Sequence, residues 1–169
     1  MDRNSMRAAS RRVVLCALLA AMTMALKMAM APLRNIEPVS LMILVCALVF
    51  GRQVFYVVFT YIFLEGLVFG FGLWWAMYLY VWPLLAGLAW LFRWMDRAWQ
   101  WALLAGGYGL CFGSLCALAY LPLGGASMAL AWAIAGLPFD FIHAGANFLL
   151  ALVLYRPLRT ALDRLPSIT

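Results

Sequence analysis

Residues 13–26 read VVLCALLAAMTMAL, with no charged side chain and no alternation of polar and apolar positions. A transmembrane β-strand alternates along about 10 residues, whereas a membrane helix needs about 20 mostly apolar residues in a row. The apolar character continues to Ala31 and is interrupted by one charge, that of Lys27. Residues 13–31 therefore predict a helix that crosses a bilayer.

The composition of the whole chain agrees with this local pattern. Of its 169 residues, 68% are hydrophobic and 11% are charged, whereas soluble domains average roughly 45–50% apolar and about 25% charged residues. A water-soluble domain of this size does not have enough interior to bury so much apolar surface. The sequence predicts one all-α integral membrane domain that covers residues 1–169.

Further apolar segments lie between short polar breaks. We expect six transmembrane helices, at 13–31, 38–50, 54–70, 77–92, 101–121 and 138–155. The second segment is short for a full crossing. Because proline is tolerated at the start of a helix and disrupts its interior, Pro138 is predicted to open the sixth helix.

The basic residues support the same count. Ten of the twelve would lie on one side of a six-helix bundle, and only Lys27 and Arg34 lie elsewhere. The ten are Arg3, Arg7, Arg11, Arg12, Arg52, Arg93, Arg97, Arg156, Arg159 and Arg164. Positive residues concentrate on the cytoplasmic side of membrane proteins. Both termini are therefore predicted to be cytoplasmic, and the formal charge of +6 does not indicate nucleic-acid binding.

Motifs for metal binding and catalysis are absent from the sequence. The four cysteines lie inside apolar runs without a C-x-x-C pair, and the chain has one histidine. There is no H-E-x-x-H, G-x-S-x-G or phosphate-binding loop. We expect no metal, no cofactor and no enzymatic activity, so energy for any transport would come from a gradient or from another subunit.

Small residues recur every four positions in two of the predicted helices. The first helix has Ala17, Ala21, Ala25 and Ala29, which form one stripe, and Lys27 points away from it. Such a stripe lets another helix approach closely, either within the protein or from a partner. The fifth helix repeats the spacing, and there we expect tight internal packing, at Ala105, Gly109, Gly113 and Ala117.

Polar and aromatic residues gather at the predicted outer side. Arg34, Asn35 and Glu37 form a polar turn after the first helix, and Glu65 lies near the outer end of the third. A dense aromatic group follows, at Trp74, Trp75, Tyr78, Tyr80 and Trp82. Tryptophan and tyrosine anchor helices at the membrane interface. Next to a carboxylate, the group equally fits a platform for a ligand.

The last predicted helix carries Asp140, His143 and Asn147 at spacings of three and four residues. These positions share one face of a helix. Ionisable residues inside membrane segments are costly and mark substrate or ion paths. Two plainer interpretations remain open: Asp140 as a carboxylate in the first turn of the helix, and His143 as a hydrogen-bond partner of Glu65 or of a tyrosine.

The chain resembles the substrate-binding S components of energy-coupling factor (ECF) transporters, which import vitamins into bacteria. The resemblance rests on the small size, the six helices, the A-x-x-x-A pattern, Asn35-Ile36-Glu37-Pro38 and the stretch from Gly136 to Phe148. It implies a multi-pass protein of the bacterial cytoplasmic membrane that binds a vitamin-like substrate and uses no cofactor itself.

The resemblance also implies partners and roles for individual residues. Ala17, Ala21 and Ala25 would contact a transmembrane coupling subunit that carries two ATPase subunits, and ATP use there would deliver the substrate inward. A flat heteroaromatic substrate would be bound in the outer half. The implied substrate-binding residues are Lys27, Arg34, Asn35, Glu37, Glu65, Trp74, Trp75, Tyr78, Tyr80, Asp140, His143 and Asn147.

Two other classes of function remain as alternatives. A membrane scaffold similar to the rod-shape protein MreD has a similar size and helix count, but it would need no polar cluster in the outer half. An intramembrane enzyme that uses Asp140 and His143 would act without ATPase partners.

Overall fold

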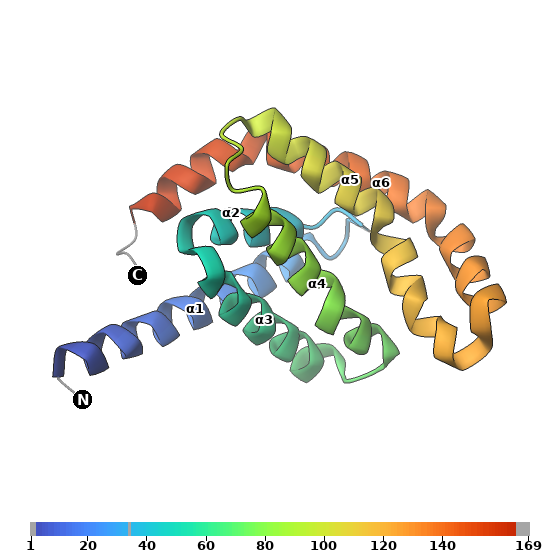
Figure 1. Cartoon of the computed structure of the whole chain (residues 1–169), viewed down its shortest axis with the longest axis horizontal. Helices are drawn as coiled ribbons and strands as arrows, with labels where there is room; N and C mark the ends of the chain where they lie inside the picture. Colours follow the sequence, from blue (N-terminus) through green and yellow to red (C-terminus); the bar gives the residue numbers. More distant parts are fainter. Residues whose placement is uncertain (1–2, 34, 165–169) are drawn as a thin grey trace.

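The computed structural model describes residues 3–33 and 35–164, and every regular element within these ranges is helical (Figure 1). The predicted all-α class is thus confirmed. The elements are α1 (Arg3–Met30), α2 (Val39–Phe50), the short 3-10 turn η1 (Gly51–Gln53), α3 (Val54–Phe69), α4 (Leu73–Leu91), α5 (Ala98–Ala117), the 3-10 turn η2 (Leu118–Tyr120) and α6 (Leu121–Asp163).

Four helical stretches of the described chain are long and apolar enough to cross a membrane. They are Ala9–Met30, Val39–Phe69, Leu73–Leu91 and Ala98–Asp163. The protein is therefore membrane-embedded. Two of these stretches contain a break in the helix, because Gly51 has a φ of 57° between α2 and α3, and Gly124 and Gly125 have non-helical dihedral angles within α6.

Helix α2 is the centre of the fold. Its residues from Val39 to Ala47 are all buried, and it contacts each of the other five α-helices. A helix that is apolar on every side is stable only where neighbours cover it all round. With 12 residues it is about 18 Å long at 1.5 Å per residue, well short of a hydrocarbon core of about 30 Å. The short second segment of the sequence therefore corresponds to a central helix covered by its neighbours.

Helices α5 and α6 form a bent hairpin that runs along one side of the molecule (Figure 1). The small residues of α5 allow their contact. A Cβ atom at Gly109 would lie 3.0 Å from the backbone N and Cα of Ala144, and one at Gly113 would lie 2.6 Å from Asp140 Oδ2. The predicted internal packing of this stripe is confirmed, since Ala105, Gly109, Gly113 and Ala117 are buried.

Several predicted boundaries differ from the structure. Helix α1 begins at Arg3, ten residues before the apolar run, because arginine, alanine and methionine also favour helix. Figure 1 shows this arginine-rich end projecting beyond the other helices. Helix α4 begins at Leu73 where 77 was expected, and α5 spans Ala98–Ala117 where 101–121 was expected.

The prediction that Pro138 opens the last helix was wrong. Helix α6 begins at Leu121, and Pro138 lies inside it. Membrane helices tolerate an internal proline where neighbouring helices, side chains or water hydrogen-bond the backbone carbonyl group that the proline leaves without a donor. At the same level α6 lies against α5, since a Cβ on Gly136 would be 3.8 Å from the Cα of Gly113.

Candidate functional site

A partly buried ion cluster joins α1, α3 and the loop between α1 and α2. Lys27 Nζ lies 2.9 Å from Glu65 Oε2 and 3.8 Å from Glu37 Oε2. The Glu65 side chain is 1% exposed. Removing one partner of a buried ion pair costs about 3–5 kcal/mol, because the other charge stays without compensation. Lys27 therefore neutralises carboxylates of the protein itself.

The same ammonium group contacts aromatic rings. Lys27 Nζ lies 5.3 Å from the ring centroid of Tyr78 on α4 and 5.7 Å from that of Phe69 on α3. A cation within about 6 Å of a ring centroid is attracted by the ring's quadrupole. The predicted neighbourhood of carboxylate, cation and aromatic group is thus present around Lys27.

A continuous series of aromatic contacts leads from Lys27 to α6. The ring of Tyr78 is 5.5 Å from that of Trp82, Trp82 is 5.3 Å from Phe112 on α5, and Phe112 is 4.8 Å from His143. All three ring contacts are edge-on or tilted, which is the geometry that aromatic quadrupoles favour. The aromatic group and the polar stripe of α6 therefore meet within the bundle.

The polar stripe of α6 faces the interior. Asp140, His143 and Asn147 are 3%, 4% and 1% exposed, which confirms that they share one face. Asp140 Oδ1 accepts a hydrogen bond of 2.9 Å from the backbone N–H of Gly113, and Asn147 Nδ2 donates one of 3.0 Å to Ser40 Oγ on α2. Because α6 begins at Leu121, Asp140 is not in a first turn, and that interpretation was wrong.

Several buried polar atoms of this region have no hydrogen-bond partner. They are Tyr61 Oη, Glu65 Oε1, Trp82 Nε1, Asp140 Oδ2, His143 Nε2 and Asn147 Oδ1, and the Tyr61 ring packs edge-on against Trp82. Such groups are rare in folded proteins, and each costs about 1–3 kcal/mol when it is left unsatisfied. Six of them on three helices, along one series of contacts, indicate a place that is built for a polar ligand or for water. Through Nε2, His143 bonds neither Glu65 nor a tyrosine.

We call the residues joined by these contacts the central cluster. Its members are Lys27, Glu37, Glu65, Tyr78, Trp82, Phe112, Asp140, His143 and Asn147. A pocket of about 220 Å³ lies next to it, with Lys27, Asn35, Glu37 and Phe69 in its wall. The pocket gives the ion cluster a route to the surface.

Other predicted binding residues serve packing. Trp75 Nε1 donates to the carbonyl oxygen of Ile62 at 2.8 Å, and the Tyr80 hydroxyl donates to that of Leu115 at 2.9 Å. Trp74 packs edge-on against Tyr78, with 5.4 Å between the ring centroids. Arg34 lies outside the described residues.

Sequence reasoning missed Phe112, Phe69 and Ser40. Phe112 and Phe69 lie within continuous apolar segments, where a phenylalanine that lines a site has the same pattern as one that faces lipid. Ser40 is the second residue of the buried helix α2, and only the fold brings it to Asn147, more than 100 residues away.

The alanine stripe of α1 faces outward. Ala17, Ala21, Ala25 and Ala29 are exposed, whereas Leu19, Ala20 and Thr23 of the same helix are buried. Lys27 points inward to Glu65, as the spacing predicted. Internal packing does not account for this stripe, because its four alanines stay exposed in the part of the chain that the structure describes.

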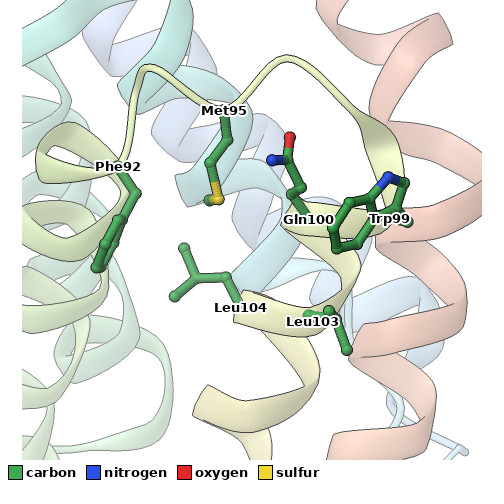
Figure 2. A pocket seen from close by; sticks show the side chains of 6 residues that line it. All are labelled: Phe92, Met95, Trp99, Gln100, Leu103 and Leu104. Carbon is green, nitrogen blue, oxygen red and sulfur yellow. The ribbon is translucent and has the colours of Figure 1, made fainter.

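Two larger surface hollows lie apart from the central cluster. One, of about 1,050 Å³, lies between α1 and α3 and includes Ala17, Arg12 and Arg52 in its wall. The other, of about 400 Å³, lies at the connection between α4 and α5. Figure 2 shows its lining by Phe92, Met95, Trp99, Gln100, Leu103 and Leu104, without an ionisable side chain.

Glu37 gives a pH-dependent prediction. Burial raises the pKa of this carboxyl group and Glu65 raises it further, while Lys27 opposes both. The folded state thus holds the proton more tightly than the unfolded chain does, whose pKa is about 4.3. The contribution of Glu37 to stability is therefore complete below about pH 4 and is lost as the pH rises through the higher pKa of the folded state.

We expect Glu37→Gln to unfold at a higher temperature than the wild type at pH 7.5 and not at pH 4, measured by thermal unfolding in detergent. An equal difference at both pH values would contradict this assignment.

Comparison with protein-family models, with curated proteins and with solved structures found no match.

Proposed function

We propose that this protein is the substrate-binding S component of an ECF-type importer, in a bacterial cytoplasmic membrane. It would capture a vitamin or a related micronutrient on the outer side and release it inward when a coupling subunit and two ATPase subunits use ATP. The observation that carries the proposal is the central cluster. A protein that only anchors or organises other proteins has no need for ionised and unpartnered polar groups inside an apolar bundle.

The proposed topology has six crossings, with both termini in the cytoplasm. The breaks at Gly51 and at Gly124–Gly125 divide two of the four apolar stretches, which is consistent with this number. Under this topology the ten arginines outside the loop 31–38 lie on the cytoplasmic side. The central cluster and the loop that carries Glu37 then lie toward the outer side.

The exposed alanine stripe supports the proposed contact with a coupling subunit. Helices associate in lipid where small residues let their backbones approach. Ala17, Ala21 and Ala25 are exposed in this way, and Ala25, the one nearest to Lys27, lies on the opposite side of α1 from it. One helix would thus present one side to the partner and the other side to the substrate.

A thermal-shift screen tests the proposal. The detergent-purified protein is heated with each member of a panel of vitamins and their precursors. A ligand at a thousandfold excess over its Kd stabilises the folded state by about 4 kcal/mol. We expect one strong hit. If no compound of the panel raises the unfolding temperature, the result would contradict the proposal and favour the scaffold.

Substitutions in the central cluster locate the site. Glu65→Gln and Asp140→Asn are each expected to weaken binding of the hit about tenfold or more, because each removes a buried charge at nearly constant shape. The measurement is a titration by calorimetry on samples that still unfold cooperatively. Asp96→Asn, a change of an exposed carboxylate in the loop between α4 and α5, is the matched control and should bind normally. Normal binding by both cluster variants would place the site elsewhere.

A further inference from the structure

The charges of the central cluster are unequal. Its described residues include three carboxyl groups, at Glu37, Glu65 and Asp140, and one ammonium group, at Lys27. Lys27 is shared by Glu37 and Glu65, and Asp140 receives only the neutral N–H of Gly113 at Oδ1. Carboxyl groups therefore outnumber the one cation in a low-dielectric interior, where an ionised carboxylate without compensation is costly.

The hydrogen-bonding capacity is unequal in the same direction. Three of the unpartnered atoms are oxygen acceptors, namely Glu65 Oε1, Asp140 Oδ2 and Asn147 Oδ1. Trp82 Nε1 is an obligatory donor, the Tyr61 hydroxyl both donates and accepts, and His143 Nε2 donates or accepts according to its tautomer. Obligatory acceptors thus outnumber obligatory donors, which favours a ligand that donates more hydrogen bonds than it accepts.

Aromatic rings join the two ends of the central cluster. Tyr78, Trp82 and Phe112 contact one another, with centroid distances of 5.3–6.5 Å. The faces of these rings are electron-rich and attract cations, as the position of Lys27 over Tyr78 already shows. Rings also stack on flat ligands.

From these three properties we infer that the central cluster binds a positively charged nitrogen base on a flat ring, such as an amidine, an amino-substituted heteroaromatic ring or a quaternised ring. Its charge balances the surplus carboxylate, its N–H groups reach Glu65 or Asp140, and its ring lies against Tyr78, Trp82 and Phe112. The adjoining pocket of about 220 Å³ is smaller than the roughly 300–1,000 Å³ of sites for drug-sized ligands, which favours a small ligand. The inference rests on the proposed function and specifies its substrate class.

Three probes with the same ring and nearly the same size test the charge. Benzamidine, benzamide and benzoate are positive, neutral and negative at pH 7.5. Each is added at millimolar concentration to the purified full-length protein, and the unfolding temperature is measured. We expect benzamidine to stabilise the protein and the other two to have no comparable effect. Equal or greater stabilisation by benzamide or benzoate, or no effect of benzamidine, overturns the inference.

Two variants separate a cationic from an anionic ligand. Lys27→Gln removes the internal cation that competes for Glu65, so benzamidine should bind about threefold more tightly or better, whereas an anion held by Lys27 would be lost. Glu65→Gln should weaken benzamidine about tenfold and would strengthen an anion. Asp96→Asn again serves as the exposed control and should change neither. If Lys27→Gln does not fold, Glu65→Gln decides alone, and a change in the opposite direction overturns the inference.

The proposed function and the charge assignment fail in different ways. If a vitamin raises the unfolding temperature and benzamidine does not, the proposed importer stands and the inference of a cationic ligand fails. A benzamidine response that follows both variants, without any hit in the vitamin panel, retains the cation site and contradicts vitamin uptake.

Discussion

Ala17→Trp is expected to abolish substrate uptake while substrate affinity stays unchanged. Ala17 is exposed on α1 and lies ten residues before Lys27, about 15 Å away along the helix axis, so an indole at this position does not reach the central cluster. It would, however, hold a partner helix several ångströms further away and remove the close backbone contact that small residues allow. Ala21→Trp, one turn further along the same stripe, should have the same effect.

The experiment compares uptake of the screened substrate in whole cells that contain the coupling and ATPase subunits with binding to the purified variant. Uptake should fall to the level of cells without the protein, and the Kd should stay within about twofold. Ala131→Trp is the matched control, because Ala131 is an exposed alanine on α6 far along the chain from the stripe. Transport that continues at the wild-type rate in both α1 variants would refute the partner face.

Gly109→Leu should destabilise the protein more than any exposed substitution. A Cβ atom at Gly109 would already lie 3.0 Å from the backbone of Ala144 and from Asn147 Nδ2, so a whole side chain forces α5 and α6 apart. Overpacking of this kind costs about 1–3 kcal/mol and occasionally more. Each kcal/mol corresponds to about 2–4 °C in unfolding temperature for a chain of this size.

Gly107→Leu is the control from the same helix. Gly107 is exposed, and a Cβ atom there would have no atom within 4 Å. Leucine also favours helix over glycine by somewhat less than about 1 kcal/mol. Gly107→Leu should therefore unfold at the same temperature as the wild type or higher. If Gly109→Leu were as stable as Gly107→Leu, the close contact of α5 with α6 would be wrong.

Periodicity and charge alone determined much of this fold. The apolar runs gave helices α2 and α3 almost to the residue, because Pro38, Gly51 and Gly70 end them abruptly. The three- and four-residue spacings placed Asp140, His143 and Asn147 on one buried face, and the two-residue spacing placed Lys27 opposite Ala25, since these relations are fixed by helix geometry. They need no knowledge of how the helices pack.

Tertiary packing decided what a single helix cannot. Helix α6 continues past Pro138, where the local sequence predicts a helix start, because α6 packs against α5 at this level. Tertiary packing also used Trp75 and Tyr80 for hydrogen bonds between elements, and it brought Phe112 from an unremarkable apolar run between Trp82 and His143. Spacing fixes which residues share a helix face. The partner of each face depends on long-range contacts, and here α2 contacts α1, α3 and α6.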